Sequence, residues 1–337
     1  MINRVFCKQT LFLVLSLIMF QGYAQKEGQD KSKIVVSTSS LEKDSESVFV
    51  RSENNLMIYP EMDGLEGRLG ENINGPSVIK VPDWIENPLG KYYMYFAHHH
   101  GKFIRLAYAN SPVGPWTVYK LGVLHIDKTA AIGHIASPDI IIDEETKTIR
   151  MYFHGYNRNK EGQKTFFSTS KNGIDFKASD IILGGPSYFR VFKYKSEYYA
   201  LVKGAFYRSK DGMQPFEKGA LILPKARHTA VSLKKDKLAV FYSQKGDAPE
   251  RILSCDVDLS EGSWKSWKAN EVKEVLKPEM DYEGVNLPIE KSVKGFSRKP
   301  LHELRDPAIL NDNKDVYLYY SVSGEFGIGV AKLLKSN

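Results

Sequence analysis

Histidine side chains gather at a few predicted strand ends in this chain. Six of the eight histidines fall at such ends, namely His98, His99, His100, His134, His154 and His228. Imidazole titrates close to neutral pH, so it can accept, donate or relay a proton. Histidines scattered over a surface would not gather in this way. The set therefore predicts a polar functional pocket suited to proton transfer.

A zinc site is the alternative interpretation of these histidines, because several of them converge with Asp139. Zinc sites take three or four ligands at characteristic spacings. Here a run of three histidines is followed by single, distant ones, which matches no such spacing, and adjacent strand residues point to opposite faces. We therefore expect neither a metal ion nor any other cofactor.

Charged residues accompany the histidines at the same strand ends. Asp139 and Asp306 stand where strands begin, and a carboxylate there either caps backbone N–H groups or acts on a ligand. Glu283 lies in the loop DYEGVNLP and is expected to reach over the pocket as an acid or to pair with Arg305. The predicted ligand-binding residues are Asn74, His98, His100, Tyr188, Arg190, Arg227, Arg305 and Asp306. The same ends also carry Asn72, Ser137, Lys203, Gln244, Glu303 and Glu325.

A fivefold repeat of aromatic-rich runs must position these residues. The runs are 92–100 (YYMYFAHHH), 149–155 (IRMYFHG), 198–204 (YYALVKG), 238–244 (LAVFYSQ) and 316–322 (VYLYYSV). Each follows a shorter apolar run, and units of short strands that recur every ~40 to 80 residues are typical of propellers. We predict an all-β chain that folds as a five-bladed β-propeller. An irregular β-sandwich is the alternative, because repeats alone do not fix closure.

The strands of each blade can be assigned from these runs. The predicted innermost strands are 76–81, 137–143, 188–194, 228–234 and 305–311, and the aromatic runs are the second strands. The third strands are 104–111, 165–171, 205–210, 251–257 and 327–333, and 116–125 is an outer strand. The fifth blade runs out of chain after its third strand, so we predict that residues 48–59 cover its open edge. Starts of first strands and ends of second strands then meet at one end of the channel.

The N-terminal residues have the pattern of a secretory signal peptide. Arg4 and Lys8 precede the apolar stretch 11–20, and Ala24 ends a small-residue site before Gln25. We predict a signal peptide over residues 1–24, a flexible polar leader over 25–55 and one propeller domain over 56–337. Because no cysteine follows the apolar stretch at lipoprotein spacing, we expect a periplasmic or secreted protein without a membrane anchor.

Composition narrows the expected partners. The chain carries 47 Lys and Arg against 40 Asp and Glu, a net charge of +7 that favours anionic partners. The lysines are scattered, without the basic runs of nucleic-acid patches, so we expect an anionic oligosaccharide, no nucleic acid and a monomer. Removal of the signal peptide would leave Cys255 alone, which excludes an intrachain disulfide and suggests a small core residue.

Two stretches resemble the five-bladed propellers of carbohydrate-active enzymes in glycoside hydrolase families 43 and 117. They are 304–333 (LRDPAILNDNKDVYLYYSVSGEFGIGVAKL) and the second unit, with SPDIIID followed by IRMYFHG. The resemblance extends over residues 60–334. It implies a base on the first blade, an orienting acid on the second and a proton donor further on. Asp139 matches the second position, and Glu283 is the candidate donor.

The first blade departs from that pattern. Residues 71–76 (ENINGP) put Asn74 where the base is expected, and an amide cannot take a proton from water, so Glu71 or Asp83 would have to replace it. A site rich in His, Tyr and Arg suits β-elimination from a uronic acid instead. In that scheme Arg190, Arg227 or Arg305 holds the carboxylate. The predicted catalytic residues are His134, Asp139, His154, His228 and Glu283.

The overall make-up also resembles the lyase-related oligosaccharide dehydratases of marine flavobacterial ulvan degradation. The shared features are the style of signal peptide, the single compact propeller and the His- and Arg-rich channel. This resemblance implies an exported enzyme that acts on uronic-acid-containing oligosaccharides, such as ulvan, as a lyase or dehydratase. Two alternatives stay open. One is a hydrolase of the family 43 or 117 type that uses Asp139, Glu283 and Asp306, and the other is a non-catalytic glycan-binding propeller.

Overall fold

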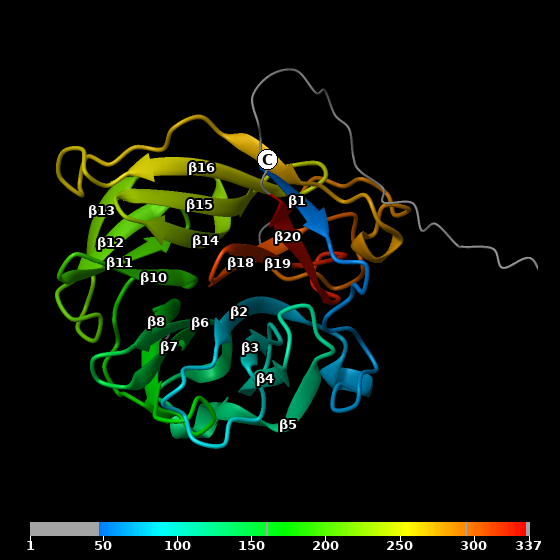
Figure 1. Ribbon diagram of the computed structural model, residues 1–337, viewed down its shortest axis with the longest axis horizontal. Helices are drawn as coiled ribbons and strands as arrows, with labels where there is room; N and C mark the ends of the chain where they lie inside the picture. Colours follow the sequence, from blue (N-terminus) through cyan, green and yellow to red (C-terminus); the bar gives the residue numbers. More distant parts are fainter. Residues whose placement is uncertain (1–46, 160, 294, 335–337) are drawn as a thin grey trace, which may run out of the picture. The chain divides into compact units, whose positions relative to one another are not determined.

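The computed structural model describes residues 47–159, 161–293 and 295–334. The predicted signal peptide, and the predicted leader up to residue 46, lie outside the described residues. Five antiparallel sheets of four strands each are arranged around a central axis (Figure 1), which confirms the predicted five-bladed β-propeller. Within the described ranges, no helix is long and apolar enough to cross a membrane.

The five blades follow one another along the chain. The first blade consists of β2 (Asn74–Lys80), β3 (Tyr92–Ala97), β4 (Phe103–Ala109) and β5 (Thr117–His125). The second consists of β6 (Ile132–Asp143), β7 (Thr148–Tyr156), β8 (Gln163–Ser170) and β9 (Lys177–Ala178). The third consists of β10 (Phe189–Tyr194), β11 (Glu197–Val202), β12 (Ala205–Ser209) and β13 (Glu217–Leu221).

The last two blades complete the circle. The fourth consists of β14 (Ala226–Lys234), β15 (Lys237–Gln244), β16 (Ile252–Asp258) and β17 (Lys273–Leu276). The fifth consists of β18 (Arg305–Asp312), β19 (Asp315–Ser321), β20 (Ile328–Leu334) and β1 (Val48–Arg51). Short 3-10 helices in the connections are η1 (Gly67–Leu69), η2 (Ile126–Lys128) and η3 (Asp281–Glu283).

The N-terminal strand closes the fifth blade, as the sequence predicted. β1 pairs antiparallel with β20, from Val48 opposite Leu334 to Arg51 opposite Ala331. The predicted polar leader, which extended to residue 55, is therefore too long. Residues 48–51 of that segment form β1, in which Phe49 packs edge-on against Phe241 of the fourth blade. Pairing removes the open sheet edge that β20 would otherwise present.

The aromatic repeat follows from how blades pack. Every residue of β3 is buried, because neighbouring blades cover both of its faces. Tyr93 and Tyr95 pack in one cluster with Phe153 of the second blade, while Met94 packs on the other side with Tyr319 of the fifth. Successive strand residues point to opposite faces of the sheet. A strand that is covered by a neighbouring blade on each face must therefore be apolar on both faces.

The innermost strands of the first, second and fifth blades carry a bulge at the end where they enter the channel. Pairing with the second strand slips between Asn74 and Ser77, between Ala136 and Asp139, and between Arg305 and Ala308. Within the slips Gly75, Ser137 and Asp306 occupy equivalent positions with φ of 63°, 49° and 45°. A bulge re-aims the side chain that it contains. In the fifth blade it turns a carboxylate toward the channel, whereas the first blade has glycine there.

In the first and second blades, the residue that ends the bulge joins the innermost strand to that of the next blade. The Ser77 hydroxyl oxygen accepts the N–H of Ile140 at 3.0 Å, and the Asp139 carboxylate accepts the N–H of Val191 at 2.6 Å. Asp139 therefore links the second blade to the third, as Ser77 links the first to the second. It stands two residues beyond the position that Asp306 holds, so it is not the equivalent of that carboxylate.

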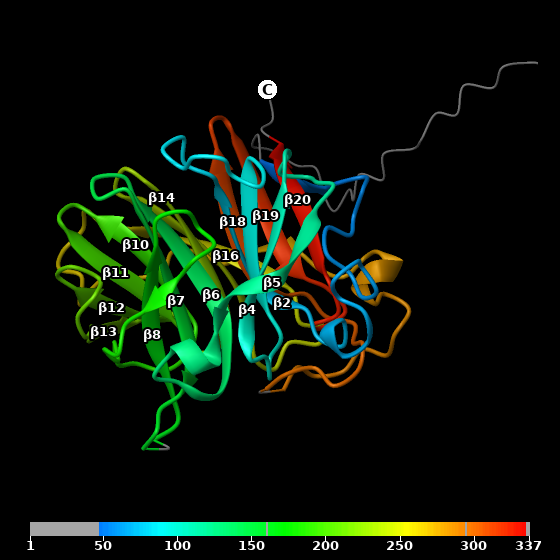
Figure 2. The ribbon, with the colours of Figure 1, turned by 90° about the horizontal axis from the view of Figure 1, so that it is seen from below.

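The two ends of the channel are formed by different connections. Figure 2 shows the β18–β19 turn at one end, and the β7–β8 turn with the orange connection between β17 and β18 at the other. Starts of innermost strands and ends of second strands lie at this second end. The residues predicted to converge therefore share one end of the propeller.

Candidate active site

Side chains from all five blades form a ring at the end of the channel where the innermost strands begin. This channel ring consists of His99, His134, His154, Tyr188, His228, Asp306 and Glu325. Its members follow the order of the blades, with His99 after β3 and Glu325 before β20. The structure thus brings together His134, His154, His228, Tyr188 and Asp306, as the sequence predicted.

Direct contacts join successive members of the ring, except between Asp306 and Glu325, which Arg305 connects. Centroid distances are 6.2 Å from His99 to His134, 5.6 Å from His134 to His154, 4.9 Å from His154 to Tyr188 and 4.6 Å from Tyr188 to His228. His228 Nδ1 then lies 3.0 Å from Asp306 Oδ1. Arg305, the neighbour of Asp306, lies 3.2 Å from Glu325, whose Oε2 is 3.7 Å from His99 Nδ1.

The histidine half of the ring consists of His99, His134 and His154. Burial and the proximity of other imidazoles lower the pKa of His99 to about 3 and that of His134 to about 4. Burial also holds the pKa of His154 well below its usual range. These imidazoles are neutral at pH 7, so each offers one N–H donor and one nitrogen acceptor.

His154 has unused hydrogen-bonding capacity. Its side chain is 1% exposed, and neither ring nitrogen has a hydrogen-bond partner among the described residues. Buried polar atoms in folded proteins almost always have a partner. The unpaired imidazole at the centre of the histidine half is therefore available to a water molecule or to a ligand group.

His228 and Asp306 form a buried acid–base pair. Burial lowers the pKa of His228, although Asp306 acts in the opposite direction. Burial would by itself raise the pKa of Asp306, but His228 and nearby arginines bring it well below the usual range. An ionised carboxylate 3.0 Å from Nδ1 favours the tautomer in which Nδ1 carries the proton, and in that tautomer Nε2 is the base.

The carboxylate half of the ring consists of Asp306 and Glu325, with Glu250 and Glu303 behind them. Arg305 contacts Glu250, Glu303 and Glu325, and Arg227 contacts Glu250 at 2.9 Å. Four acids thus face two arginines. Burial raises the pKa of Glu325 to about 7 and also raises that of Glu303, so this cluster retains a proton near neutral pH.

Comparison with known proteins places the chain in a family. No protein-family model matches it. It is 35% identical over 300 residues to "Uncharacterized protein R118" of Acanthamoeba polyphaga mimivirus, a match that covers 78% of this chain and 84% of the viral protein. The chain belongs to the family of this viral protein.

Solved structures share the fold at low identity. A structure from the GH130 family of mannoside phosphorylases, which contains glycoside hydrolases that target β-1,2 mannosidic linkages in Candida mannan, superposes with a TM-score of 0.60 and 14% identity, over 87% of this chain and 95% of that one. A GH43_1 enzyme from Xanthomonas citri gives 0.53 and 14%, over 78% and 88%. The predicted resemblance to propellers of glycoside hydrolase family 43 is confirmed for the fold.

The three predicted carboxylate-binding arginines are engaged within the protein. Arg227 donates to the carbonyl oxygens of Val293 and Gly295 at 2.7 Å each, besides contacting Glu250. Arg190 donates to Pro138 and lies 4.0 Å from Asp139. Arg305 is 1% exposed among its three glutamates. These guanidinium groups neutralise buried acids and fix the backbone, which corrects the prediction that they hold a ligand.

The role predicted for Glu283 is also wrong. It does not pair with Arg305, and its fully buried carboxylate accepts hydrogen bonds from Arg51 of β1 at 2.7 Å and from the Tyr320 hydroxyl at 2.9 Å. The N–H groups of Glu279 and Met280 bind its other oxygen. Because β1 is the outermost strand of its blade, Glu283 fastens the closing strand and is not a proton donor in the channel.

Asp139 lines the channel but lies outside the ring. A small cavity of about 100 Å³ between the innermost strands is bordered by Ser77, Asp139 and Arg190. Burial raises the pKa of Asp139 to about 6 despite Arg190 and the N–H of Val191. Its role is the capping role that the sequence analysis considered, which joins two blades.

The remaining predicted residues support the ring or border it. Asn74 donates to Glu325 at 3.2 Å, as Asn72 does at 2.6 Å. His98 accepts the N–H of His100, whose exposed ring meets Phe296 at 4.4 Å. Sequence reasoning missed Phe296 and Glu250, since neither lies at a repeated strand position. The unusual length of the connection 277–304 was the only available signal for Phe296.

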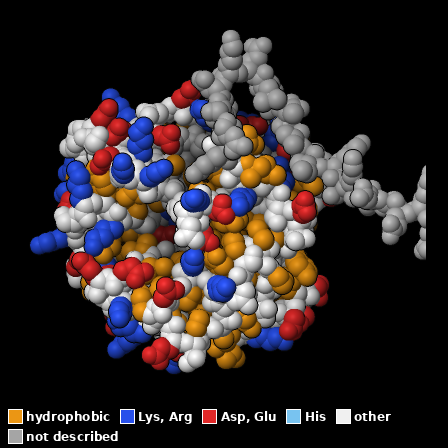
Figure 3. Space-filling view, viewed as in Figure 1, with side chains coloured by type: hydrophobic (Ala, Val, Ile, Leu, Met, Phe, Trp, Pro, Cys, Tyr) orange, Lys and Arg blue, Asp and Glu red, His pale blue; other side chains and the backbone are white. Residues whose placement is uncertain are grey.

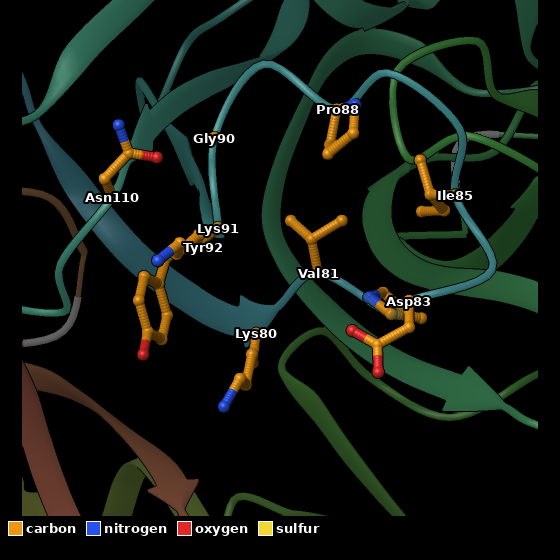
Figure 4. A pocket seen from close by; sticks show the side chains of 10 residues that line it. Lys80, Val81, Asp83, Ile85, Pro88, Gly90, Lys91, Tyr92 and Asn110 are labelled. Atoms are coloured by element: carbon orange, nitrogen blue, oxygen red, sulfur yellow. The ribbon is translucent and has the colours of Figure 1, made fainter.

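A recess at the opposite end of the propeller is distinct from this site. It measures about 500 Å³ and lies beneath the loop between β2 and β3, beside Lys80 and Tyr92 (Figure 4). Both side chains bind Asp312, at 2.9 Å and 2.5 Å. Figure 3 looks onto this end, where lysine and arginine side chains border the central hollow.

In the described part of the chain, no group of three or more His, Cys, Asp or Glu is arranged to hold a metal ion.

Proposed function

We propose that this protein is a carbohydrate-active enzyme that performs β-elimination at a uronic acid of an anionic oligosaccharide such as ulvan, as a lyase or a dehydratase. The channel ring carries the proposal, because neutral imidazoles and Tyr188 stand beside the His228–Asp306 pair. The fold is shared with glycoside hydrolases, which supports a carbohydrate substrate. We further propose a monomer that is exported through a cleaved signal peptide to the periplasm or beyond.

The proposed reaction needs a base and an acid on one sugar. Nε2 of His228 removes the proton from the carbon next to the carboxylate, and that electron pair forms a double bond to the adjacent carbon. The bond from that adjacent carbon to oxygen breaks, and the oxygen leaves with its electrons. Tyr188, whose ring lies 4.6 Å from that of His228, protonates the departing oxygen. If this oxygen belongs to a sugar the enzyme is a lyase, and if it is a free hydroxyl the enzyme is a dehydratase.

A positive charge beside the reacting sugar would stabilise the transition state. The Nζ atom of Lys203 lies 5.2 Å from the centroid of the Tyr188 ring. Because its ammonium group lies beside the assigned proton donor, Lys203 is the cation that we assign to the substrate carboxylate. Neutralising that carboxylate makes the neighbouring carbon proton more acidic. His154, with both nitrogens unpaired, is assigned to a sugar hydroxyl.

The test is to incubate the protein with saturated ulvan oligosaccharides in heavy-oxygen water. Elimination gives ultraviolet absorbance from the new double bond, and mass spectrometry shows no heavy oxygen in the products. Hydrolysis adds one heavy oxygen for each bond cleaved, without absorbance, and this result would overturn the proposal. Tight binding with no product over long incubation would also overturn it, in favour of a glycan-binding propeller.

Hydrolysis is the second candidate, and the two carboxylates of the ring favour it. The pKa values of Asp306 and Glu325 are pushed apart, one well below its usual range and one to about 7. A paired base and acid of this kind is what a glycosidase needs. In this version Glu325 replaces Glu283 as the donor. Loss of activity in Glu325→Gln, with His228→Ala still active, would support hydrolysis over elimination.

A further inference from the structure

The connection between the fourth and fifth blades brings an aromatic side chain to the edge of the channel ring. It spans residues 277–304 and is longer than the other connections between blades, which cover 52–73, 126–131, 179–188 and 222–225. Phe296 of this connection contacts two histidines of the first blade, with centroid distances of 5.2 Å to His99 and 4.4 Å to His100. A single loop therefore reaches from the last blades to the first beside the site.

Buried arginines hold this loop in place. Arg227 donates to the carbonyl oxygens of Val293 and Gly295, and Arg305 also lies 3.5 Å from the oxygen of Gly295. Ser292 pairs with residues 246 and 247 of the fourth blade through its backbone. Phe296 directly follows Gly295. Arg227 and Arg305, which contact the buried glutamates, therefore also hold the backbone next to this phenyl ring.

The loop adds a positive charge at the same place. The guanidinium carbon of Arg298 lies 5.4 Å from the centroid of Phe296. Arg298 and His100 are exposed and Phe296 is half-buried, so a ligand can reach all three. An aromatic face suits the C–H face of a sugar ring, and the planar guanidinium group suits a carboxylate. The three side chains combine both kinds of contact.

We propose that Phe296, His100 and Arg298 form a subsite for a uronic acid adjacent to the sugar that reacts. This inference rests on the proposed function, since it assigns a neighbouring sugar of the same anionic chain. The ring of this second sugar stacks on Phe296 beside His100, and its carboxylate binds Arg298. His99 contacts Phe296 and belongs to the channel ring, so the subsite adjoins the reacting position.

The experiment measures binding by calorimetry in a His228→Ala background, which removes the assigned base. The probes are saturated ulvan oligosaccharides and the same oligosaccharides after carboxyl reduction. Phe296→Ala should weaken binding of both probes about fivefold to tenfold, and Phe296→Tyr should retain it. Arg298→Gln should weaken binding of the acidic probe about threefold to tenfold at low salt, without affecting the reduced probe. Lys299→Gln is the matched control, because Lys299 pairs with Glu290 on the same loop.

The outcomes separate this inference from the proposed function. If the native protein eliminates ulvan oligosaccharides but Phe296→Ala and Arg298→Gln bind both probes normally, the subsite is wrong and the function stands. If no elimination occurs but binding depends on Phe296 and Arg298 as described, the subsite stands and the chemistry is wrong. If neither probe binds and no product forms, both are wrong.

Discussion

The two halves of the channel ring accommodate buried polar groups by opposite means. In the histidine half, burial and mutual proximity keep His99, His134 and His154 uncharged, and His154 has no described hydrogen-bond partner. In the carboxylate half, Arg305 contacts three glutamates. Burial raises the pKa of Glu325 to about 7, and a proton on this carboxyl group reduces the negative charge of the cluster. Neutral, partly unpaired groups are available to a ligand, whereas the charged groups are occupied with one another.

The junction of the halves is where the difference matters for chemistry. This junction is His228 with Asp306. His228 combines features of both halves, because it is a buried neutral imidazole whose Nδ1 faces an ionised carboxylate. That carboxylate is stabilised by the arginines of one half, while Tyr188 connects the imidazole to the other. The junction is thus the best place in the ring for a proton to be taken up during a reaction.

The largest effect is expected from breaking the junction. Asp306→Asn and His228→Ala should each lower kcat/KM on ulvan oligosaccharides by about a hundredfold to ten-thousandfold, because the base loses its orientation or is removed. The double variant should lose little more than either single one, since the two act as a unit. Asp312→Asn, at the other end of β18, is the control. A change below about tenfold in both single variants would exclude the pair from proton transfer.

The second-largest effect is expected on stability, because we assign the buried arginines a structural role. Arg305→Met should lower the free energy of unfolding by about 3–5 kcal/mol, because it leaves buried acids without their counter-charge. Denaturant unfolding followed by fluorescence measures this change. Arg298→Met, on the exposed loop, should change it by less than about 0.5 kcal/mol. A loss below about 1 kcal/mol in Arg305→Met would show that the acids do not depend on it.

The dependence of stability on pH should have opposite signs in the two halves. The pKa of His99 falls to about 3, so its contribution is complete above the ordinary value near 6.5 and is lost as pH falls toward 3. The pKa of Glu325 rises to about 7 from 4.5, so its contribution is complete below 4.5 and is lost as pH rises through 7.

Two single substitutions separate these contributions. His99→Gln should flatten the loss of unfolding free energy below pH 6.5, and Glu325→Gln should flatten the loss between pH 4.5 and 7. Unfolding in urea across this pH range provides the measurement, and Lys299→Gln serves as the unaffected control. Equal slopes in both variants and in the native protein would refute the assignment of opposite charge states to the two halves.

The smallest effect is expected at Asp139. Asp139→Asn should change activity by less than about threefold and unfolding free energy by less than about 1 kcal/mol, because an amide oxygen still accepts the N–H of Val191. The carboxyl is already half protonated near pH 6, so loss of its charge is a small perturbation. Activity and unfolding assays at that pH test this. A loss as large as that of Asp306→Asn would make Asp139 catalytic.

Much of the fold could be predicted because packing between blades imposes a local pattern. Residues on both faces of β3 are buried, which requires the aromatic run that the sequence displays. Closure by β1 was predictable because the fifth unit lacked a fourth strand. The histidines of the ring were predictable for the same reason, since their places at strand ends follow from the repeat.

The partners of charged residues could not be predicted in this way. Glu283 lies far in sequence from Arg51, and Glu250 from Arg305, so no local pattern signals these pairs. The prediction therefore assigned Arg227 and Arg305 to a ligand, although buried acids and backbone oxygens occupy them. Phe296 was missed because loop residues carry no periodicity.

The sequence by itself determined the five-bladed architecture and the end of the channel at which the histidines gather, because strand periodicity and repeats are local properties of the chain. Only the tertiary structure decided which of those residues are charged, paired or left open. Burial sets the pKa of His99 and Glu325, and contacts between distant segments set the partners of Arg305 and Glu283. Both depend on what the folded chain places around each group, which no single segment encodes.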